Sequence, residues 1–124
     1  MNGAILIVDD DEIIVEILKE LFEAEGYNVK KAFNGEEGVK EIYDDGIDLV
    51  LLDIRMPKMN GYDVCKIIRE HKETYNLPVI VLTAHNTLEA RERFKGMNIE
   101  DIISKPFNPE YLIQRVKKAL GNYK

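Results

Sequence analysis

Polar residues with the chemistry of a phosphoryl-binding site follow apolar segments at four places in the sequence. Asp9 and Asp10 follow AILIV, Asp53 follows DLVLL, Thr83 follows PVIVL and Lys105 follows DIIS. If the segments that end in acids lie side by side, their three carboxylates repel one another unless a cation compensates. With no Cys or His beside these acids, the oxygen ligands favour Mg²⁺ or Mn²⁺, which shares its coordination with phosphate. Lys105 would add a positive charge and Thr83 a hydroxyl donor, so the set is suited to hold a phosphoryl group on or beside a carboxylate.

Apolar segments that alternate with amphipathic ones must position these residues. Length and β-branched content predict the strands, and apolar residues at helical spacing predict the helices. The predicted strands are residues 4–8, 28–32, 48–52, 78–82 and 101–104, and the predicted helices are residues 11–25, 35–44, 61–72, 86–95 and 109–120. Asn34, Asn60 and Asn86 are candidate N-caps, and Pro109 suits a first helical turn. In the first helix, the apolar residues at helical spacing are Ile14, Ile17, Leu18, Leu21 and Phe22.

This alternation predicts the fold. Regular βα units favour the α/β class, with a doubly wound, five-stranded parallel sheet covered by helices on both faces in a flavodoxin-like three-layer sandwich. The segments 4–8, 48–52 and 78–82 are almost wholly apolar and suit central strands, whereas 28–32 carries two lysines and suits an edge. The predicted strand order is therefore 2-1-3-4-5, which gathers the polar residues at the carboxyl edge of the sheet.

Length, charge and cysteine content limit the function classes. The 124 residues predict one domain over residues 1–124, and no apolar segment approaches the length of about 20 residues that a membrane span needs. The net charge of -6, with dispersed Lys and Arg, argues against nucleic-acid binding. A lone Cys65 and a first segment without signal-peptide features predict a cytoplasmic protein without membrane contact.

Three other phosphate or metal motifs do not fit. A calcium EF-hand loop would place a ligand where DDDEIIVEILKE has Ile13. A P-loop or dinucleotide fold needs glycines in the first βα turn, where this chain has DDDE. A flavodoxin-type FMN site meets the same difficulty, although the fold would suit it.

Four motifs in order resemble those of the receiver domain of two-component response regulators, the CheY-like proteins. They are ILIVDDDE, LVLLDIRMPKMNG, VIVLTA and SKPF, and Thr83 precedes Lys105 by 22 positions, as receivers usually have. The resemblance implies that Asp53 is a phosphoacceptor that attacks a phosphohistidine on a partner kinase. It also implies a signalling protein rather than an enzyme, since such a domain catalyses only its own phosphorylation and dephosphorylation.

The resemblance also implies roles for neighbouring residues. Asp10, Asp53 and the backbone carbonyl of Arg55 would bind Mg²⁺ or Mn²⁺ directly, and Asp9 would act through a water. Lys105 would pair with Asp53 and then with a phosphoryl oxygen. The other expected residues are a helix-capping Asp11, a Thr83 hydroxyl that binds the phosphoryl group, a phosphoryl pocket formed by Ala84, Ile54 and Arg55, and a cis peptide bond before Pro106.

Three residues depart from the pattern. The family reads out phosphorylation through Thr83 and an aromatic ring three positions before the lysine, where this chain has Ile102, so we expect a reduced aromatic switch. The family tends to carry Gly-Ala before the fifth strand, where this chain has Asn98 and Ile99.

Arg55 and His85 bear on the stability of the phosphorylated form. By the resemblance, both would flank the path of the water that hydrolyses it, so we expect the phosphoryl group to last for minutes or longer.

The partner and the extent of the protein leave alternatives open. We expect a stand-alone receiver without an output domain, acting as a phosphorelay intermediate or a chemotaxis-type switch on a downstream protein target. Ile14, Pro106 and Phe107 would dock a histidine kinase or histidine phosphotransfer domain. The alternatives are a receiver fragment of a larger DNA-binding response regulator or hybrid kinase, and an unphosphorylated adaptor with the same fold.

Overall fold

A five-stranded parallel sheet forms the middle layer of the computed structural model, which describes residues 3–44, 46–84 and 87–121. Its strand order is β2-β1-β3-β4-β5, so the predicted fold class and order are confirmed. The strands are β1 (Ala4–Val8), β2 (Asn28–Ala32), β3 (Leu49–Asp53), β4 (Val79–Thr83) and β5 (Asp101–Ser104). The helices are α1 (Glu12–Ala24), α2 (Gly35–Asp44), α3 (Gly61–Glu70), α4 (Thr87–Arg93) and α5 (Pro109–Leu120).

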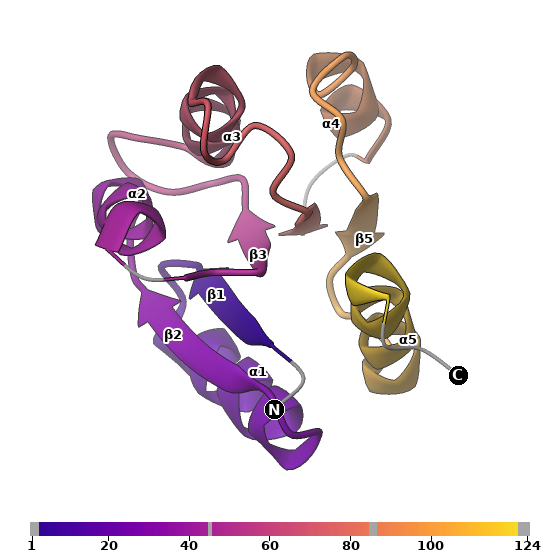
Figure 1. The fold of residues 1–124 in the computed structure, drawn as a ribbon. Helices are drawn as coiled ribbons and strands as arrows, with labels where there is room; N and C mark the ends of the chain where they lie inside the picture. The colour runs from indigo at the N-terminus through magenta and orange to yellow at the C-terminus, as the bar shows by residue number, and fades with distance from the viewer. Residues whose placement is uncertain (1–2, 45, 85–86, 122–124) are drawn as a thin grey trace.

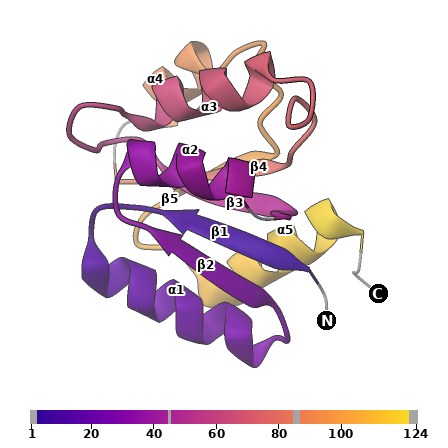
Figure 2. The same cartoon turned by 60° about the vertical axis from the view of Figure 1, so that its left-hand side comes forward.

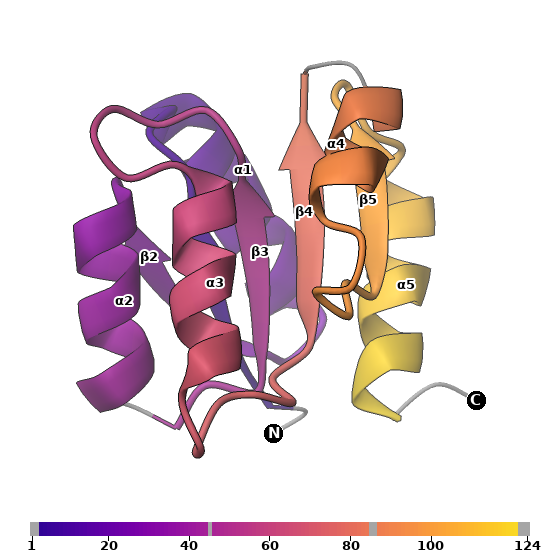
Figure 3. The same cartoon turned by 90° about the horizontal axis from the view of Figure 1, so that it is seen from above.

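Helices cover both faces of the sheet. The helices α2, α3 and α4 form one layer, and α1 and α5 form the other (Figures 1 and 3). Each layer packs its own apolar cluster against the sheet, with Val64 and Ile68 in the first and Leu18 and Val116 in the second. Because β1, β3 and β4 lie between two helical layers, nearly all their side chains are buried, as their apolar sequences predict.

Strands β3 and β4 each begin and end one residue later than predicted. Asp53 pairs with Leu82 and Thr83 pairs with Ser104, so the two polar residues are the last residues of their strands rather than the first of the following loops. Both side chains are buried. A polar side chain after an apolar segment suggests the end of the strand, but backbone pairing continues through Asp53 and Thr83.

The predicted caps are found wherever they can be examined. Asp11 accepts hydrogen bonds from the backbone of α1, and Asn60 forms a reciprocal capping box with Asp63 at α3. Asn34 accepts from the Glu37 amide at the start of α2. Pro109 occupies the first turn of α5 behind Asn108, a cap that the sequence reading missed. Asn86 lies outside the described residues, and α3 and α4 end two residues before their predicted ends.

The surface of α1 departs from its predicted pattern. Val15, Leu18 and Phe22 are fully buried against the sheet, where Figure 2 shows the helix beneath β1 and β2. Ile17 has the helical spacing of a core residue but is 49% exposed, and Ile13 is 73% exposed. The apolar stripe of α1 is therefore wider than the face that the sheet covers, and its outer edge is available to a partner.

Arg69 connects α3 to two distant segments. Its guanidinium donates hydrogen bonds to the backbone carbonyls of Leu77, before β4, and of Met97 and Asn98, before β5. Asn98 has φ 58, in the left-handed region that Asn tolerates, so the turn before β5 forms without the family's glycine. Across the described residues, no helix is long and apolar enough to cross a bilayer.

Candidate functional site

Three carboxylates meet at the carboxyl edge of the sheet. Asp9 and Asp10 follow β1, Asp53 ends β3, and these strands are paired neighbours in which Val8 lies beside Leu52. Asp9, Asp10 and Asp53 each offer an oxygen, and these oxygens lie within 4.8 Å of one another. Asp9 and Asp53 are 2% and 7% exposed, while Asp10 is open to solvent. Three hard oxygen donors around one point, one of them accessible, fit a small divalent cation such as Mg²⁺.

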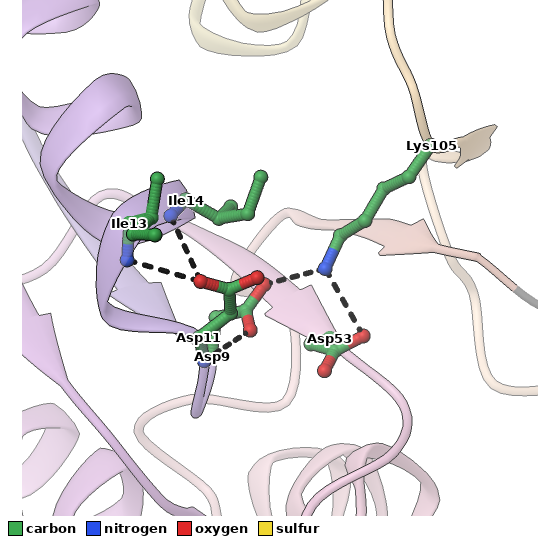
Figure 4. A network of polar contacts seen from close by, with 6 residues as sticks. All are labelled: Asp9, Asp11, Ile13, Ile14, Asp53 and Lys105. Carbon is green, nitrogen blue, oxygen red and sulfur yellow. Dashed lines mark hydrogen bonds and ion pairs between the residues drawn. The ribbon is translucent and has the colours of Figure 1, made fainter.

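Lys105 lies between two of these carboxylates. Its Nζ donates to Oδ2 of Asp9 at 2.7 Å and lies 3.5 Å from Oδ1 of Asp53 (Figure 4). Its backbone amide donates to the carbonyl of Thr83, and its peptide bond to Pro106 is cis, as expected. We predicted a pair with Asp53, and the structure shows that pair together with a closer bond to Asp9. The lysine thus offsets part of the negative charge of both acids.

Burial and charge shift the acid–base properties of this group. Burial, followed by the charge of Asp9, raises the pKa of Asp53 from 3.8 to about 6, although Lys105 partly opposes the shift. For Lys105, burial acts to lower the pKa, but the hydrogen bond and charge of Asp9 outweigh it and leave the pKa above its ordinary value. At neutral pH the Asp53 carboxylate is therefore ionised at an energetic cost, which a bound cation can relieve.

Replacing Asp53 with Asn should raise the free energy of unfolding at pH 7 by about 2 kcal/mol when divalent metals are chelated. A carboxyl whose pKa is higher in the folded than in the unfolded state destabilises the fold as it ionises. The cost is absent below pH 3.8 and complete above about 6. The gain should therefore disappear at pH 4, which urea unfolding of both proteins at the two pH values would measure. An equal difference at both pH values would contradict this origin.

The other predicted residues lie around this group. Thr83 is fully buried at the end of β4, while the neighbouring Ala84 is exposed. Ile54 is buried and Arg55 is exposed in the loop after β3. The use of the Arg55 carbonyl as a metal ligand stays a prediction, and His85 lies outside the described residues.

The roles of the predicted switch and docking residues stay predictions, and the structure gives only their surroundings. Ile102 is 9% exposed and belongs to the cluster beneath α3 and α4. Ile14 and Phe107 are half-buried at the edge of the opposite cluster, and Pro106 is exposed. Asp11 accepts from the amides of Ile13 and Ile14 and serves as the expected helix cap (Figure 4).

Sequence reasoning missed the contribution of α4 to this edge. Arg93 of α4 and Tyr62 of α3 line a cleft that also reaches Asp10. Neither residue has a signal of its own in the sequence, since Tyr62 and Arg93 each lie within an amphipathic segment rich in charge. Only the packing of α3 beside α4 brings them to the acidic cluster.

Comparison with known proteins identifies the domain. The family model of the response regulator receiver domain matches residues 5–117. The transcriptional regulatory protein CpxR of Escherichia coli strain K12 is 43% identical over 116 residues, which make up 94% of this chain and 48% of that protein. The chain spans about half the length of the curated relatives it matches.

Solved structures agree with this family. The CheY-like receiver domain protein from Methanospirillum hungatei JF-1 has a TM-score of 0.88 and 33% identity, covering 96% of this chain and 94% of that one. The receiver domain of a signal transduction histidine kinase from Syntrophus aciditrophicus has the same TM-score and identity, covering 98% of this chain and 92% of that one. The chain therefore belongs to the response regulator receiver domains of two-component signal transduction.

Proposed function

We propose that this receiver accepts a phosphoryl group on Asp53 in a Mg²⁺-dependent reaction, from the phosphohistidine of a histidine kinase or histidine phosphotransfer domain. The observation that carries the proposal is the meeting of three carboxylates with Lys105 at one edge of the sheet. A carboxylate with a raised pKa, held beside a fixed ammonium, is positioned for phosphoryl transfer, which depends mainly on positioning and electrostatics.

Asp9, Asp10, Asp53 and the carbonyl of Arg55 would hold the metal. When bound, Mg²⁺ (or Mn²⁺) supplies positive charge for the carboxylates and the phosphoryl oxygens. Because Asp9 already accepts from Lys105, we assign it the outer role through a water and give Asp10, which is exposed, direct contact.

The protein's own groups account for the transfer. A carboxylate oxygen of Asp53 forms a bond to phosphorus while the bond from phosphorus to the histidine nitrogen breaks, and the imidazole keeps the electron pair. Lys105 and the hydroxyl of Thr83 stabilise phosphoryl oxygens, and the exposed Ala84 leaves them room. The domain would thus act as a phosphoacceptor, catalysing only its own phosphorylation and dephosphorylation.

We further propose that the signal passes through protein contacts in the cytoplasm. Ile14, Pro106 and Phe107, extended by the exposed Ile13 and Ile17, would dock the phosphodonor. With Ile102 in place of a ring, Thr83 and the backbone of β4 and α4 would carry most of the switch. A receiver that acts on its own as a relay is one candidate. A receiver within a larger DNA-binding regulator or a hybrid kinase is the alternative, which the genomic reading frame distinguishes.

Intact mass after incubation with acetyl phosphate tests the acceptor. We expect a gain of about 80 Da, one phosphoryl group, that requires Mg²⁺ and is absent from Asp53→Ala. Asp11→Asn is the matched control, because it removes a neighbouring charge but keeps a good helix cap and should still gain mass. A gain that persists in Asp53→Ala would exclude Asp53 as the acceptor. No gain from acetyl phosphate or from a phosphohistidine donor would favour the adaptor alternative.

A further inference from the structure

A cleft of about 570 Å³ opens between α2 and the segment that joins α3 to β4. It lies at the amino edge of the sheet, because Ile47 and Leu77, two of its lining residues, come just before β3 and β4. Figure 3 shows α2 and α3 side by side, and both helices end at this edge. Asp53 ends β3 at the opposite edge, so the cleft is separate from the acidic cluster.

The cleft has an apolar floor and an aromatic wall. Its apolar lining residues are the buried Ile42 and the half-buried Ile47 and Leu77. The Tyr43 ring meets the His71 ring edge-on, with centroids 5.0 Å apart, and Tyr43 is still 48% exposed. An open ring above an apolar floor suits a long side chain with an apolar stem and a cationic head.

The two segments that border the cleft are strongly acidic. Residues 41–48 and 70–77 together contain six acidic residues, one lysine and no arginine. Glu73 lines the cleft and forms no ion pair within the part of the chain that the structure describes. The guanidinium of Arg69 does not line the cleft and is already bound to three backbone carbonyls. The charge of this edge therefore favours a cation.

The ends of two helices act in the same direction. The C-terminal carbonyls of α2 and α3 place partial negative charge at the cleft. The last turn of α2 has no basic residue to offset this charge, and the basic residue in the last turn of α3 is Arg69, which binds other segments. Tyr75, in the same segment as Glu73, is 54% exposed and adds aromatic surface of the kind enriched at protein interfaces.

We propose that this cleft binds an arginine-containing basic segment of a partner protein, with one guanidinium stacked on the ring of Tyr43 and paired with Glu73. The arginine stem would cover Ile47 and Leu77. Arginine fits better than lysine, because a planar and weakly hydrated guanidinium both stacks on rings and pairs with carboxylates. Since the cleft lies at the edge opposite Asp53, the inference does not depend on phosphorylation.

Backbone amide NMR shifts test the site directly. Isotope-labelled protein would be titrated at low salt with tri-arginine, acetylated and amidated at its ends, and with tri-citrulline, which has the same shape without the charge. For tri-arginine we expect shifts centred on Ile47, Thr74 and Leu77, with a dissociation constant of about 1 mM or below. Binding of tri-citrulline should be at least about fivefold weaker, because it can neither pair with a carboxylate nor use the acidic surroundings.

Two substitutions locate the anchor within the cleft. Tyr43→Leu removes the ring but keeps an apolar side chain, and Glu73→Gln removes the charge but keeps the shape. Each should weaken tri-arginine binding about threefold, and the double variant about tenfold. Glu20→Gln is the matched control, because it removes an exposed carboxylate from α1, on the other face of the sheet. Its affinity should stay within about 1.5-fold of the native value.

Several outcomes would overturn the proposal. Equal binding of the two peptides would exclude recognition of the guanidinium. Shifts that centre on the acidic cluster or spread evenly over the surface would exclude this cleft, as would native affinity in the double variant. If tri-arginine has no effect and the same amides shift when the protein alone is diluted, a second copy of the chain occupies the cleft instead.

Discussion

Replacing Lys105 with Met is expected to slow the labelling of Asp53 by acetyl phosphate by about 100-fold or more. The Nζ of Lys105 is the positive group fixed between Asp9 and Asp53, at 2.7 Å and 3.5 Å from their oxygens. It is half-buried and held by the end of β5, so it needs little reorganisation to meet a phosphoryl oxygen. A fixed charge of this kind contributes most where negative charge moves during the reaction.

The substitution also acts on the acceptor before transfer. Lys105 lowers the pKa of Asp53, which burial and Asp9 raise to about 6, so its removal moves that pKa closer to neutral pH. A smaller fraction of Asp53 is then ionised at pH 7 in the metal-free protein, so Mg²⁺ has to displace more protons from the site. The labelling rate of Lys105→Met should therefore rise more steeply between pH 6 and pH 8 than the native rate. This follows because only the ionised carboxylate attacks phosphorus.

Lys19→Met serves as the control for the loss of one positive charge. Lys19 forms a surface ion pair with Glu23 at 3.0 Å in the C-terminal half of α1, at the end of the helix away from the acidic cluster. Its replacement should leave labelling within about twofold of native, because a surface ion pair contributes little to stability or to a distant site. Labelling of Lys105→Met within about threefold of the native rate would show that Lys105 has only a structural role.

The features predictable from sequence are those governed by local pattern. Apolar segments of strand length, alternating with helical ones, allow only a few topologies, and polar residues directly after them must meet at one edge of a parallel sheet. Asp9, Asp53 and Lys105 come together for this reason, although they are far apart along the chain. The caps Asp11 and Asn60 were predictable because their hydrogen bonds reach only a few residues.

The features that were not predictable depend on contacts between distant elements. The packing of α4 on α3 brings Arg93 onto the ring of Tyr62, and no spacing within either segment encodes that pair. Arg69 reaches carbonyls on two connecting segments for the same reason. Ile17 has core spacing but is exposed, since the sheet covers only part of the apolar stripe of α1. Helical period alone does not say how wide the covered face is.

A glycine beside Asp53 gives the second large effect. Replacing Gly61 with Ala is expected to lower the free energy of unfolding by about 3 kcal/mol or more. Gly61 begins α3, and its amide donates to the carbonyl of Ile54 at 2.8 Å. A Cβ at this position would collide with the backbone carbonyl oxygen of Asp53 and lie 2.9 Å from Cα of Ile54. Both obstacles are backbone atoms, so no side chain can move aside to make room.

The same collision should impair the site as well as the fold. To admit the methyl group, either the start of α3 or the end of β3 must shift, and the second change moves Asp53 away from Lys105 and Asp9. We therefore expect Gly61→Ala to slow labelling by acetyl phosphate at least about tenfold under conditions where the variant is still folded, since small displacements of reacting groups are costly.

Gly46→Ala is the matched control, because a Cβ there meets nothing within 4 Å. Urea unfolding and labelling rates of both variants would decide the matter. If Gly61→Ala has the native stability and the native labelling rate, the loop between Asp53 and α3 can relax without disturbing the acceptor. If it loses stability but is labelled at the native rate, the packing of α3 does not determine the position of Asp53.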